Sequence, residues 1–242
     1  MKNIFLRTFA TASLCCALLG AGALAQDAPS ADNLLQAMRE MTVSQGNKDV
    51  AGNIRKTRTK VPFSLSARGE TIVFQYKENN EWKRFDVRIR EKSAQLIQVV
   101  GGKATVMAPA SYTKNIAGTD VCYEDLSLRF LYWKGGKVLA DSAGSRIKGR
   151  DCYVVEVPNP NPSVGQFAWV RMWIDKENGT SWQIDGYGRD GKLKKRFTIT
   201  SVQKLDDGSW FFKQMKLEVR SPQDPNRTIA LNYLEMDDLP KR

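Results

Sequence analysis

The sequence predicts an α+β fold, mainly antiparallel β, in which a strongly curved sheet has its concave face covered by helices. Three observations lead to this prediction: one helical period near the N-terminus, apolar and polar residues that alternate from about Val61 onward, and tight-turn pairs between the alternating runs. Successive hairpins of this kind form a meander. Because an open twisted sheet becomes unfavourable beyond roughly ten strands, the meander must curl, and its apolar inner face then encloses a cavity.

The first 25 residues, MKNIFLRTFATASLCCALLGAGALA, have the features of a signal peptide: a positively charged start, an apolar run and an A-x-A cleavage site. A lipoprotein signal is the alternative, because Cys15 and Cys16 lie in the apolar run. That signal needs a small residue before its cysteine, whereas Leu14 and Cys15 stand there. We therefore expect cleavage after Ala25, export to the periplasm, and a single domain over residues 26–242.

A short amphipathic helix is expected after the polar segment 27–32. Apolar residues recur there at helical spacing, at Leu34, Leu35, Met38 and Met41. Ser30 or Asp32 is the expected N-cap. The methionine-rich face either packs on the core or contacts a ligand, since methionine side chains adapt to irregular surfaces.

Two strands joined by the turn-forming segment KENNEW are expected next, followed by a second hairpin at Gly101-Gly102. Alternation places the apolar residues of the first hairpin on one face, at Ile72, Phe74, Tyr76, Phe85, Val87 and Ile89. The segment YEDLSLRFLYW, Tyr123 to Trp133, is the better of the remaining helix candidates. Its aromatic density also permits a strand.

The C-terminal half has the clearest alternation. Asn178-Gly179 predicts a type I′ hairpin turn, and Asp190-Gly191 and Asp207-Gly208 predict two more turns. One face of these strands collects apolar side chains at Val170, Met172, Ile174, Trp182, Ile184, Leu193, Phe197, Ile199, Phe211, Met215, Leu217 and Val219. The span therefore predicts the central hairpins of the meander, and its aromatic residues are expected to form a wall rather than an active site.

The composition excludes several catalytic systems. The chain contains no histidine, so Ser-His-Asp and Cys-His nucleophilic systems cannot be built, and zinc catalytic sites lose their commonest ligand. Neighbouring acids at Asp120, Glu124 and Asp125, and at Asp206 and Asp207, leave a carboxylate-dependent glycoside hydrolase as the enzymatic alternative. Capping and turn chemistry explain these acids equally well. We expect no enzyme activity, no cofactor and no metal site.

The charge favours anionic partners. Removal of residues 1–25 takes two basic residues and no acidic one from 37 basic and 26 acidic side chains, which leaves a net charge of +9. In an exported protein such a charge attracts anionic head groups rather than nucleic acid. Two basic runs, NIRKTRTK at 53–60 and KLKKR at 192–196, either contact such a surface or form a solvated loop, edge strand or strand face.

Two cysteines remain after processing, Cys122 and Cys152. An even number in an oxidising compartment makes a disulfide the expected arrangement, and both cysteines lie in strand-like runs, DVCYEDL and DCYVVEV. The alternative is two separate buried thiols that behave as small hydrophobic residues. Either arrangement is structural, because the chain has no C-x-x-C redox motif.

Four segments appear in an order that resembles a known family: GTDVCYEDL, GRDCYVVEVPNP, VRMWIDKENGTSWQIDGYGRDGKLKKRFTITSVQKLDDGSWFFKQMKLEV and TIALNYLEMDDLP. Over roughly residues 60–240 the chain resembles the LolA-like outer-membrane lipoprotein-sorting proteins, and in particular an uncharacterised bacterial branch. The resemblance implies a strongly curved, unclosed β-barrel (half-barrel) with a helical lid over an apolar cavity that accepts acyl chains. In characterised members this cavity shields the lipid of a lipoprotein during periplasmic transit. The cysteines at 122 and 152 depart from that branch.

We therefore expect a carrier that shields acyl chains from water, because each exposed methylene costs about 0.8 kcal/mol. The expected cavity lining is Leu35, Met38, Met41, Phe74, Tyr76, Phe85, Val87, Trp182, Ile184, Phe197, Phe211 and Met215. The expected partners of this monomer are an acylated lipoprotein or phospholipid, with transient contacts to membrane proteins or an anionic membrane surface, and no nucleic acid. A periplasmic sensor or interaction module with the same half-barrel is the alternative.

Overall fold

The computed structural model describes residues 29–46, 49–90, 93–140, 145–204 and 210–238. The expected signal peptide with its cleavage site and the Asp207-Gly208 turn lie outside these ranges, and they stay predictions. Within the described residues, no helix has both the length and the apolar character needed to cross a membrane.

The described chain consists of two α-helices, two 3-10 helices and fourteen strands. The helices are α1 (Ala31–Gly46), η1 (Pro109–Ser111), α2 (Tyr123–Ser127) and η2 (Arg129–Tyr132). The strands are β1 (Val50–Lys56), β2 (Thr59–Arg68), β3 (Thr71–Glu78), β4 (Glu81–Arg90), β5 (Ser93–Val100), β6 (Lys103–Val106), β7 (Lys137–Leu139), β8 (Arg146–Ile147), β9 (Arg150–Pro158), β10 (Trp169–Asp175), β11 (Ser181–Tyr187), β12 (Leu193–Lys204), β13 (Trp210–Arg220) and β14 (Thr228–Met236).

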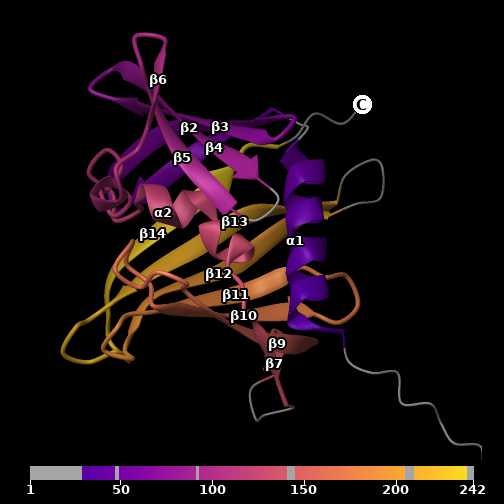
Figure 1. Ribbon diagram of the computed structural model, residues 1–242. Coiled ribbons are helices and arrows are strands. Elements are labelled where there is room, and N and C mark those ends of the chain that lie inside the picture. The colour runs from indigo at the N-terminus through magenta and orange to yellow at the C-terminus, as the bar shows by residue number, and fades with distance from the viewer. Residues whose placement is uncertain (1–28, 47–48, 91–92, 141–144, 205–209, 239–242) are drawn as a thin grey trace, which may run out of the picture.

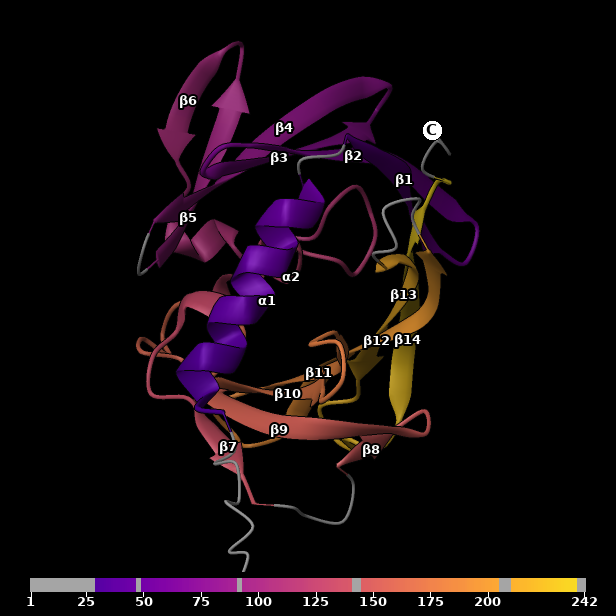
Figure 2. The same ribbon diagram turned by 90° about the vertical axis from the view of Figure 1, so that its right-hand side faces the viewer.

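All strands belong to one antiparallel sheet with the order β6-β5-β4-β3-β2-β1-β14-β13-β12-β11-β10-β9-β7, and β8 pairs with β9 off this path. The two edge strands, β6 and β7, do not pair with each other, so the sheet is curved but unclosed. Figure 2 shows the sheet turning from β6 through β1 and β14 to β9, with α1 lying across the open side. The expected half-barrel with a helical cover is confirmed.

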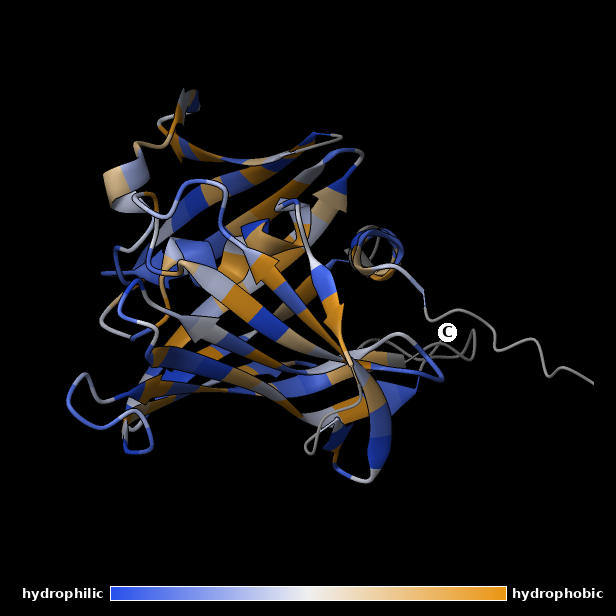
Figure 3. Cartoon of the chain, turned by 60° about the horizontal axis from the view of Figure 1, so that its bottom comes forward, coloured by the Kyte–Doolittle hydropathy of each residue, from blue (hydrophilic) through white to orange (hydrophobic). Residues whose placement is uncertain are grey.

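The core lies on the inner face of the sheet, beneath the helices. Alternation along each strand separates an apolar inner row from a polar outer row, as the banded strands in Figure 3 show. On β4, for example, Phe85 and Val87 belong to the main core, whereas Arg84 and Arg88 are exposed on the outer face. Inside the curve, α1 contacts β2 and η2, and η2 contacts β5, so both helices pack on strands of the N-terminal half of the sheet (Figure 1).

The segment Tyr123 to Trp133 is helical, as expected, but it is divided. Leu128 has left-handed backbone angles, φ 46° and ψ 30°, which end α2 and start η2. A left-handed residue at this position is a common helix terminator. Leu126 of α2 and Phe130 and Leu131 of η2 all belong to the main core.

The basic segment at 53–60 forms part of an interior hairpin rather than a solvated edge. Strand β1 pairs with β2 along its whole length and with β14 from Gly52 to Arg55, so it joins the two halves of the sheet. Val50 and Ile54 supply its buried inner row. The expectation of an edge strand is therefore wrong, because charged residues on the outer face of β1 hid its inner alternation, whereas Thr57 and Arg58 do form an exposed turn between β1 and β2.

The turn at Asn178-Gly179 closes a hairpin, but it is not the expected type I′ turn. Gly179 has φ 71°, whereas Asn178 does not have a positive φ. The Asp175 side chain accepts hydrogen bonds from the backbone of Glu177 and, at 3.4 Å, Asn178, which supports a longer loop. Positive φ at both turn residues occurs instead in KENNEW, at Asn79 and Asn80.

A β-bulge changes the position of Trp182. Met172 pairs with Ile184 and Trp173 with Gln183, but Ile174 pairs with Ser181, so Trp182 is an extra residue on β11. Trp182 packs in a second cluster with Trp173, Cys152 and Val154, and its indole donates a hydrogen bond to Asp175 at 2.8 Å. The prediction that Trp182 shares the cavity with Ile184 is therefore wrong, since a bulge breaks the period-two alternation on which it depended.

The two cysteines are free and buried, and the predicted disulfide is not formed. Cys122 is not in a strand but is the N-cap of α2, where Gln166 Nε2 lies 3.1 Å from its sulfur. Cys152 lies on β9 and packs in the second cluster with Trp173. The thiols thus occupy different environments, and the structure matches the alternative of two separate buried thiols.

Candidate functional site: an apolar cavity under the helices

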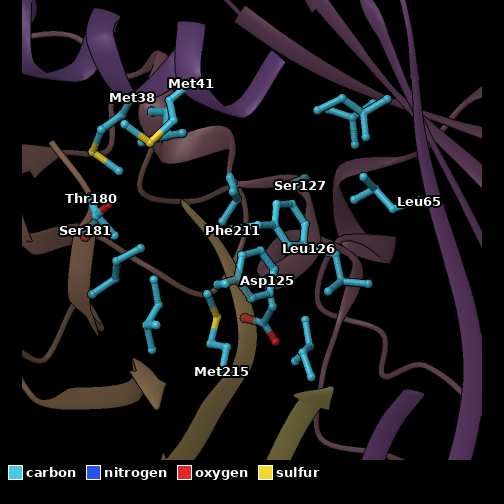
Figure 4. A pocket seen from close by; sticks show the side chains of 18 of the residues that line it. Met38, Met41, Leu65, Asp125, Leu126, Ser127, Thr180, Ser181, Phe211 and Met215 are labelled. Carbon is cyan, nitrogen blue, oxygen red and sulfur yellow. The ribbon is translucent and has the colours of Figure 1, made fainter. Parts of the chain in front are cut away.

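A cavity of about 190 Å³ lies between the helices and the inner face of the sheet. Figure 4 shows side chains of α1, α2 and the sheet converging on it. Its lining is mainly apolar and comprises Met38, Met41, Phe63, Leu65, Ile72, Phe74, Val87, Ile89, Asp125, Leu126, Ser127, Leu128, Leu131, Tyr132, Gly179, Thr180, Ser181, Ile184, Ile199, Val202, Phe211, Phe212, Met215, Leu234 and Met236. Such a cavity accepts apolar groups and offers few polar partners to water.

The predicted residues fall into three groups. Those that line the cavity are Met38, Met41, Phe74, Val87, Ile184, Phe211 and Met215. Four others are buried in the main core outside the lining: Leu35, Tyr76, Phe85 and Phe197. Trp182 lies in the second cluster. Ligand binding by the lining residues stays a prediction.

Sequence reasoning missed two contributions to the lining. Strands β2 and β14 provide Phe63, Leu65, Leu234 and Met236, and their period-two alternation could have identified them. The helical segment from α2 to η2 provides residues 126–128, 131 and 132. Apart from Ser127, the sequence identifies these residues only as apolar or aromatic, because the turn at Leu128 decides which of them line the cavity.

Helix α1 is fixed at its N-terminal end and by one polar contact. A β-carbon on Gly136 would lie 3.2 Å from Ala31 Cβ and 3.5 Å from Leu35 Cδ1, so this end of α1 packs closely on the chain before β7. Arg39 Nη1 donates a hydrogen bond of 2.6 Å to the carbonyl of Leu131, and its guanidinium lies 5.7 Å from the centre of the Tyr132 ring. Met38 and Met41 face the cavity from the same helix.

A buried ion pair connects α2 to the wall of the sheet. Lys195 is only 6% exposed, and its ammonium lies 2.5 Å from Asp125 Oδ2 and donates to the Asp120 carbonyl. Burial is the largest single effect and opposes the charged ammonium, but the interactions with Asp125, Cys122 and Asp120 together outweigh it and raise the pKa of Lys195. The expectation that the KLKKR run is a solvated strand face is therefore wrong for Lys195.

Asp125 is the charged group in the cavity lining, and it is already satisfied. Its Oδ1 accepts a hydrogen bond from Gln166 Nε2 at 2.7 Å, and its Oδ2 accepts one from the Cys122 backbone at 2.8 Å in addition to Lys195. The carboxylate therefore belongs to a structural network that holds α2 in place. This network leaves the apolar walls to determine what the cavity accepts.

Glu124 is fully buried beside Asp125 but does not line the cavity. Its Oε2 accepts a hydrogen bond of 2.6 Å from the Gln166 backbone, and its Oε1 lies 3.6 Å from Arg129 Nη1 without a hydrogen bond. Burial raises the pKa of Glu124 to about 7, although the Gln166 amide and Arg129 act in the opposite direction. A β-carbon on Gly165 would lie 2.1 Å from Glu124 Oε1, so glycine is required there.

Three of the carboxylates weighed for a glycoside hydrolase, Asp120, Glu124 and Asp125, make other contacts. Asp120 forms an ion pair of 2.9 Å with Lys56 and a hydrogen bond with Asn232, and Asp125 and Glu124 are held as described above. Asp206 and Asp207 lie outside the described residues. Among the residues that the structure describes, there is no group of three or more histidine, cysteine or acidic side chains placed to hold a metal ion.

Three solved structures have a similar fold. They are a putative outer membrane lipoprotein-sorting protein domain from Vibrio parahaemolyticus (TM-score 0.63, 15% identity, 85% of this chain and 90% of that one), a LolA superfamily protein from Nitrosomonas europaea (0.61, 14%, 89% and 94%), and a DUF1329 family protein from Desulfovibrio piger (0.55, 14%, 86% and 90%). At these identities the likeness concerns the fold.

In sequence, a search of curated proteins gave no match. A family model with the description "uncharacterized protein" matches residues 102–239, which is more than half of the chain and spans α2 and strands β6 to β14. The matched region contains the buried network around Asp125 and one wall of the cavity. The chain therefore belongs to this family of uncharacterized proteins, and its fold is that of the LolA-like, outer-membrane lipoprotein-sorting proteins.

Proposed function

We propose that the protein is a periplasmic carrier that holds an acyl chain of a lipoprotein or phospholipid in the cavity beneath α1. The observation that carries the proposal is the cavity itself, because a mainly apolar space between a curved sheet and a methionine-bearing helix suits an acyl chain, and the one carboxylate in its lining, Asp125, is held by Lys195 and Gln166. The fold shared with lipoprotein-sorting proteins supports it. The proposed carrier is a monomer that contacts membrane proteins or an anionic membrane surface transiently.

The size of the cavity sets an expected affinity. An apolar cavity of roughly 150 Å³ accommodates benzene, so by proportion a cavity of about 190 Å³ holds roughly eight carbon atoms. At about 0.8 kcal/mol per methylene, their transfer from water contributes roughly 6 kcal/mol before the costs of binding. This corresponds to a dissociation constant between micromolar and millimolar, which allows a carrier to release its cargo.

A longer chain requires α1 to move outward. Its N-terminal end is packed against Gly136, whereas its central turn is held to η2 by the Arg39 hydrogen bond to Leu131. In the proposed cycle this hydrogen bond breaks as a cargo enters, and Met38 and Met41 then repack on the added methylenes. The helix is therefore the proposed lid.

The experiment uses the mature protein after removal of lipid, titrated with a fluorescent fatty acid. Leu65→Trp fills the cavity from the inner face of β2, and Ser66→Trp places the same side chain on the outer face of that strand. We expect Leu65→Trp to weaken probe binding at least tenfold and Ser66→Trp to leave it unchanged, with circular dichroism confirming that both variants fold. Equal binding by both variants would reject the cavity as the site.

A vesicle assay tests the carrier role itself. A carrier moves a labelled phospholipid or acylated peptide from donor to acceptor vesicles at a rate that rises with protein concentration. A protein that binds the probe in the cavity without accelerating this exchange is not a carrier, and the result would favour the sensor alternative.

A further inference from the structure

A second depression lies on the outer face of the sheet, across β1 to β4, on the opposite side from the proposed lipid cavity. Its lining includes Asn53, Pro62, Ser64, Gln75, Trp82 and Asp237. Strand pairing brings these residues together, since Asn53 pairs with Pro62, Ser64 with Gln75, and Lys77 with Trp82. Phe74 and Phe85, which alternate with these residues on β3 and β4, belong to the main core, so most of the lining comes from the other side of the same strands, and Phe63 contributes to its edge.

Trp82 has no structural partner that explains its position. Its side chain is 56% exposed, although tryptophan is among the residues with most to gain from burial. Within the described part of the chain, Trp82 takes part in no ring-ring contact and lies beneath no cation, unlike Trp133, Trp169 and Trp182. An indole face is therefore available to a ligand in this depression.

Polar groups with free hydrogen-bonding capacity surround the indole. Gln75 accepts a hydrogen bond from Ser64 at 3.4 Å, which leaves its amide nitrogen as a donor without a partner among the described residues. The side chains of Asn53 and Asp237 likewise have no hydrogen-bond partner in the ranges that the structure describes. Arg84, directly opposite Gln75, is fixed by two hydrogen bonds to Asp86 at 2.8 and 2.9 Å.

We propose that this depression binds a pyranose ring of a glycan. A pyranose has a face of C–H groups, which complements the negative face of an indole. Its rim of hydroxyl groups can donate to carboxylate and amide oxygens and accept from amide nitrogens. A protein partner fits less well, because a stable interface buries roughly 800 Å² on each side around an apolar centre. Here the apolar surface comes from one exposed ring, Trp82, with Ala51, Pro62 and the buried Phe63 beside it, which is too small an area for such an interface.

The test uses a β-1,4-linked N-acetylglucosamine tetramer, titrated into the mature protein and followed by calorimetry. We expect saturable binding that Trp82→Ala weakens at least tenfold and that Gln75→Ala weakens by a smaller factor. Val100→Ala is the matched control, because Val100 is also exposed, at 66%, but lies at the end of β5 outside the depression. Leu65→Trp, which fills the lipid cavity, is expected to keep glycan binding, so this proposal and the carrier proposal fail independently.

Two arms distinguish the source of the ring. Purified cell-wall glycan, pelleted with the protein, tests a polymeric source, and vesicles that contain a glycolipid test a lipid-linked sugar. Retention in either arm that is lost in Trp82→Ala supports the proposal. Absence of binding to the tetramer and in both arms would overturn it, as would tetramer binding that survives Trp82→Ala. A photo-cross-linker at position 82 that captures a polypeptide and no glycan would also overturn it.

Discussion

At the scale of single residues, Glu124 makes stability depend on pH. Burial holds its pKa at about 7 instead of the ordinary 4.5. Below pH 4.5 the carboxyl is neutral in both the folded and the unfolded chain. Between these values the folded protein keeps a proton that the unfolded chain releases, so stability present at low pH is lost as the pH rises through about 7. The rise of the pKa from 4.5 to about 7 corresponds to roughly 3 kcal/mol in the free energy of unfolding.

Replacement of this carboxyl by a neutral amide tests the effect. We expect Glu124→Gln to unfold in urea with a free energy equal to that of the parent at pH 4, and roughly 2 to 3 kcal/mol higher at pH 8. The amide oxygen can still accept the hydrogen bond from the Gln166 backbone. Glu70→Gln, at an exposed turn, controls for the loss of one negative charge. The same difference at both pH values would contradict the assignment.

At the scale of elements, the contact between α1 and η2 determines how tightly the lid is held. Arg39→Ala removes a charge-assisted hydrogen bond to Leu131 and the stacking on Tyr132. Such a bond contributes about 1.5 to 3 kcal/mol, so we expect release of a bound fatty-acid probe to be roughly ten- to a hundredfold faster, measured by stopped-flow fluorescence. Gln36→Ala, on the exposed side of α1, should leave the rate unchanged. Equal rates of probe release from both variants would show that Arg39 does not hold the lid closed.

The outer face of the C-terminal strands is stabilised by a row of alternating charges. Lys137, Glu156, Arg171, Asp185, Arg196 and Glu218 stand directly opposite one another on β7, β9, β10, β11, β12 and β13. Asp185 is fully buried in this row, and Arg196 binds its two oxygens at 2.7 and 2.6 Å. The hydrogen bond to Asp185 raises the pKa of Arg196. Long charged side chains thus cover a face on which the described residues place no second layer.

Removal of one charge from this row should be costly. We expect Asp185→Asn to lower the free energy of unfolding by about 3 kcal/mol, because it leaves Arg196 without its bidentate partner in a partly buried place. Asp190→Asn breaks an ion pair to Lys194 at an exposed turn and should have no measurable effect. Chemical denaturation of both variants checks this contrast. If Asp185→Asn lowers the free energy of unfolding no more than Asp190→Asn does, the row of charges does not contribute to stability.

At the scale of the whole molecule, Asp120 joins the two halves of the sheet. Strands β1 and β14 pair directly at four positions. The loop before α2 adds side-chain contacts to both strands through Asp120. Asp120 binds Lys56 of β1 and Asn232 of β14, and its carbonyl accepts from Lys195 of β12. We expect Asp120→Ala to lower the free energy of unfolding by about 2 kcal/mol in thermal or urea denaturation. Glu70→Ala is the exposed control, and an equal loss there would reject the role of this junction.

The class of fold and most of the inner row of the sheet could be predicted from local sequence patterns. Period-two alternation places Phe74, Val87 and Phe211 on the core side because successive strand residues must face opposite ways. The helical spacing of Met38 and Met41 likewise placed both in the cavity lining. These are local regularities, and they are visible wherever the chain keeps its period.

Tertiary contacts determined the orientation of side chains where the strand or helix pattern is interrupted, and the pairing of residues far apart in the chain. The bulge at Trp182 and the left-handed turn at Leu128 redirect side chains where the local pattern predicts continuity. The local sequence around Lys195 predicts a solvated charge. In the fold its ammonium lies 2.5 Å from Asp125 Oδ2, seventy residues earlier in the chain. Burial of a charge is favourable only when a partner and hydrogen bonds replace water, and those partners come from elements that only the folded sheet brings together.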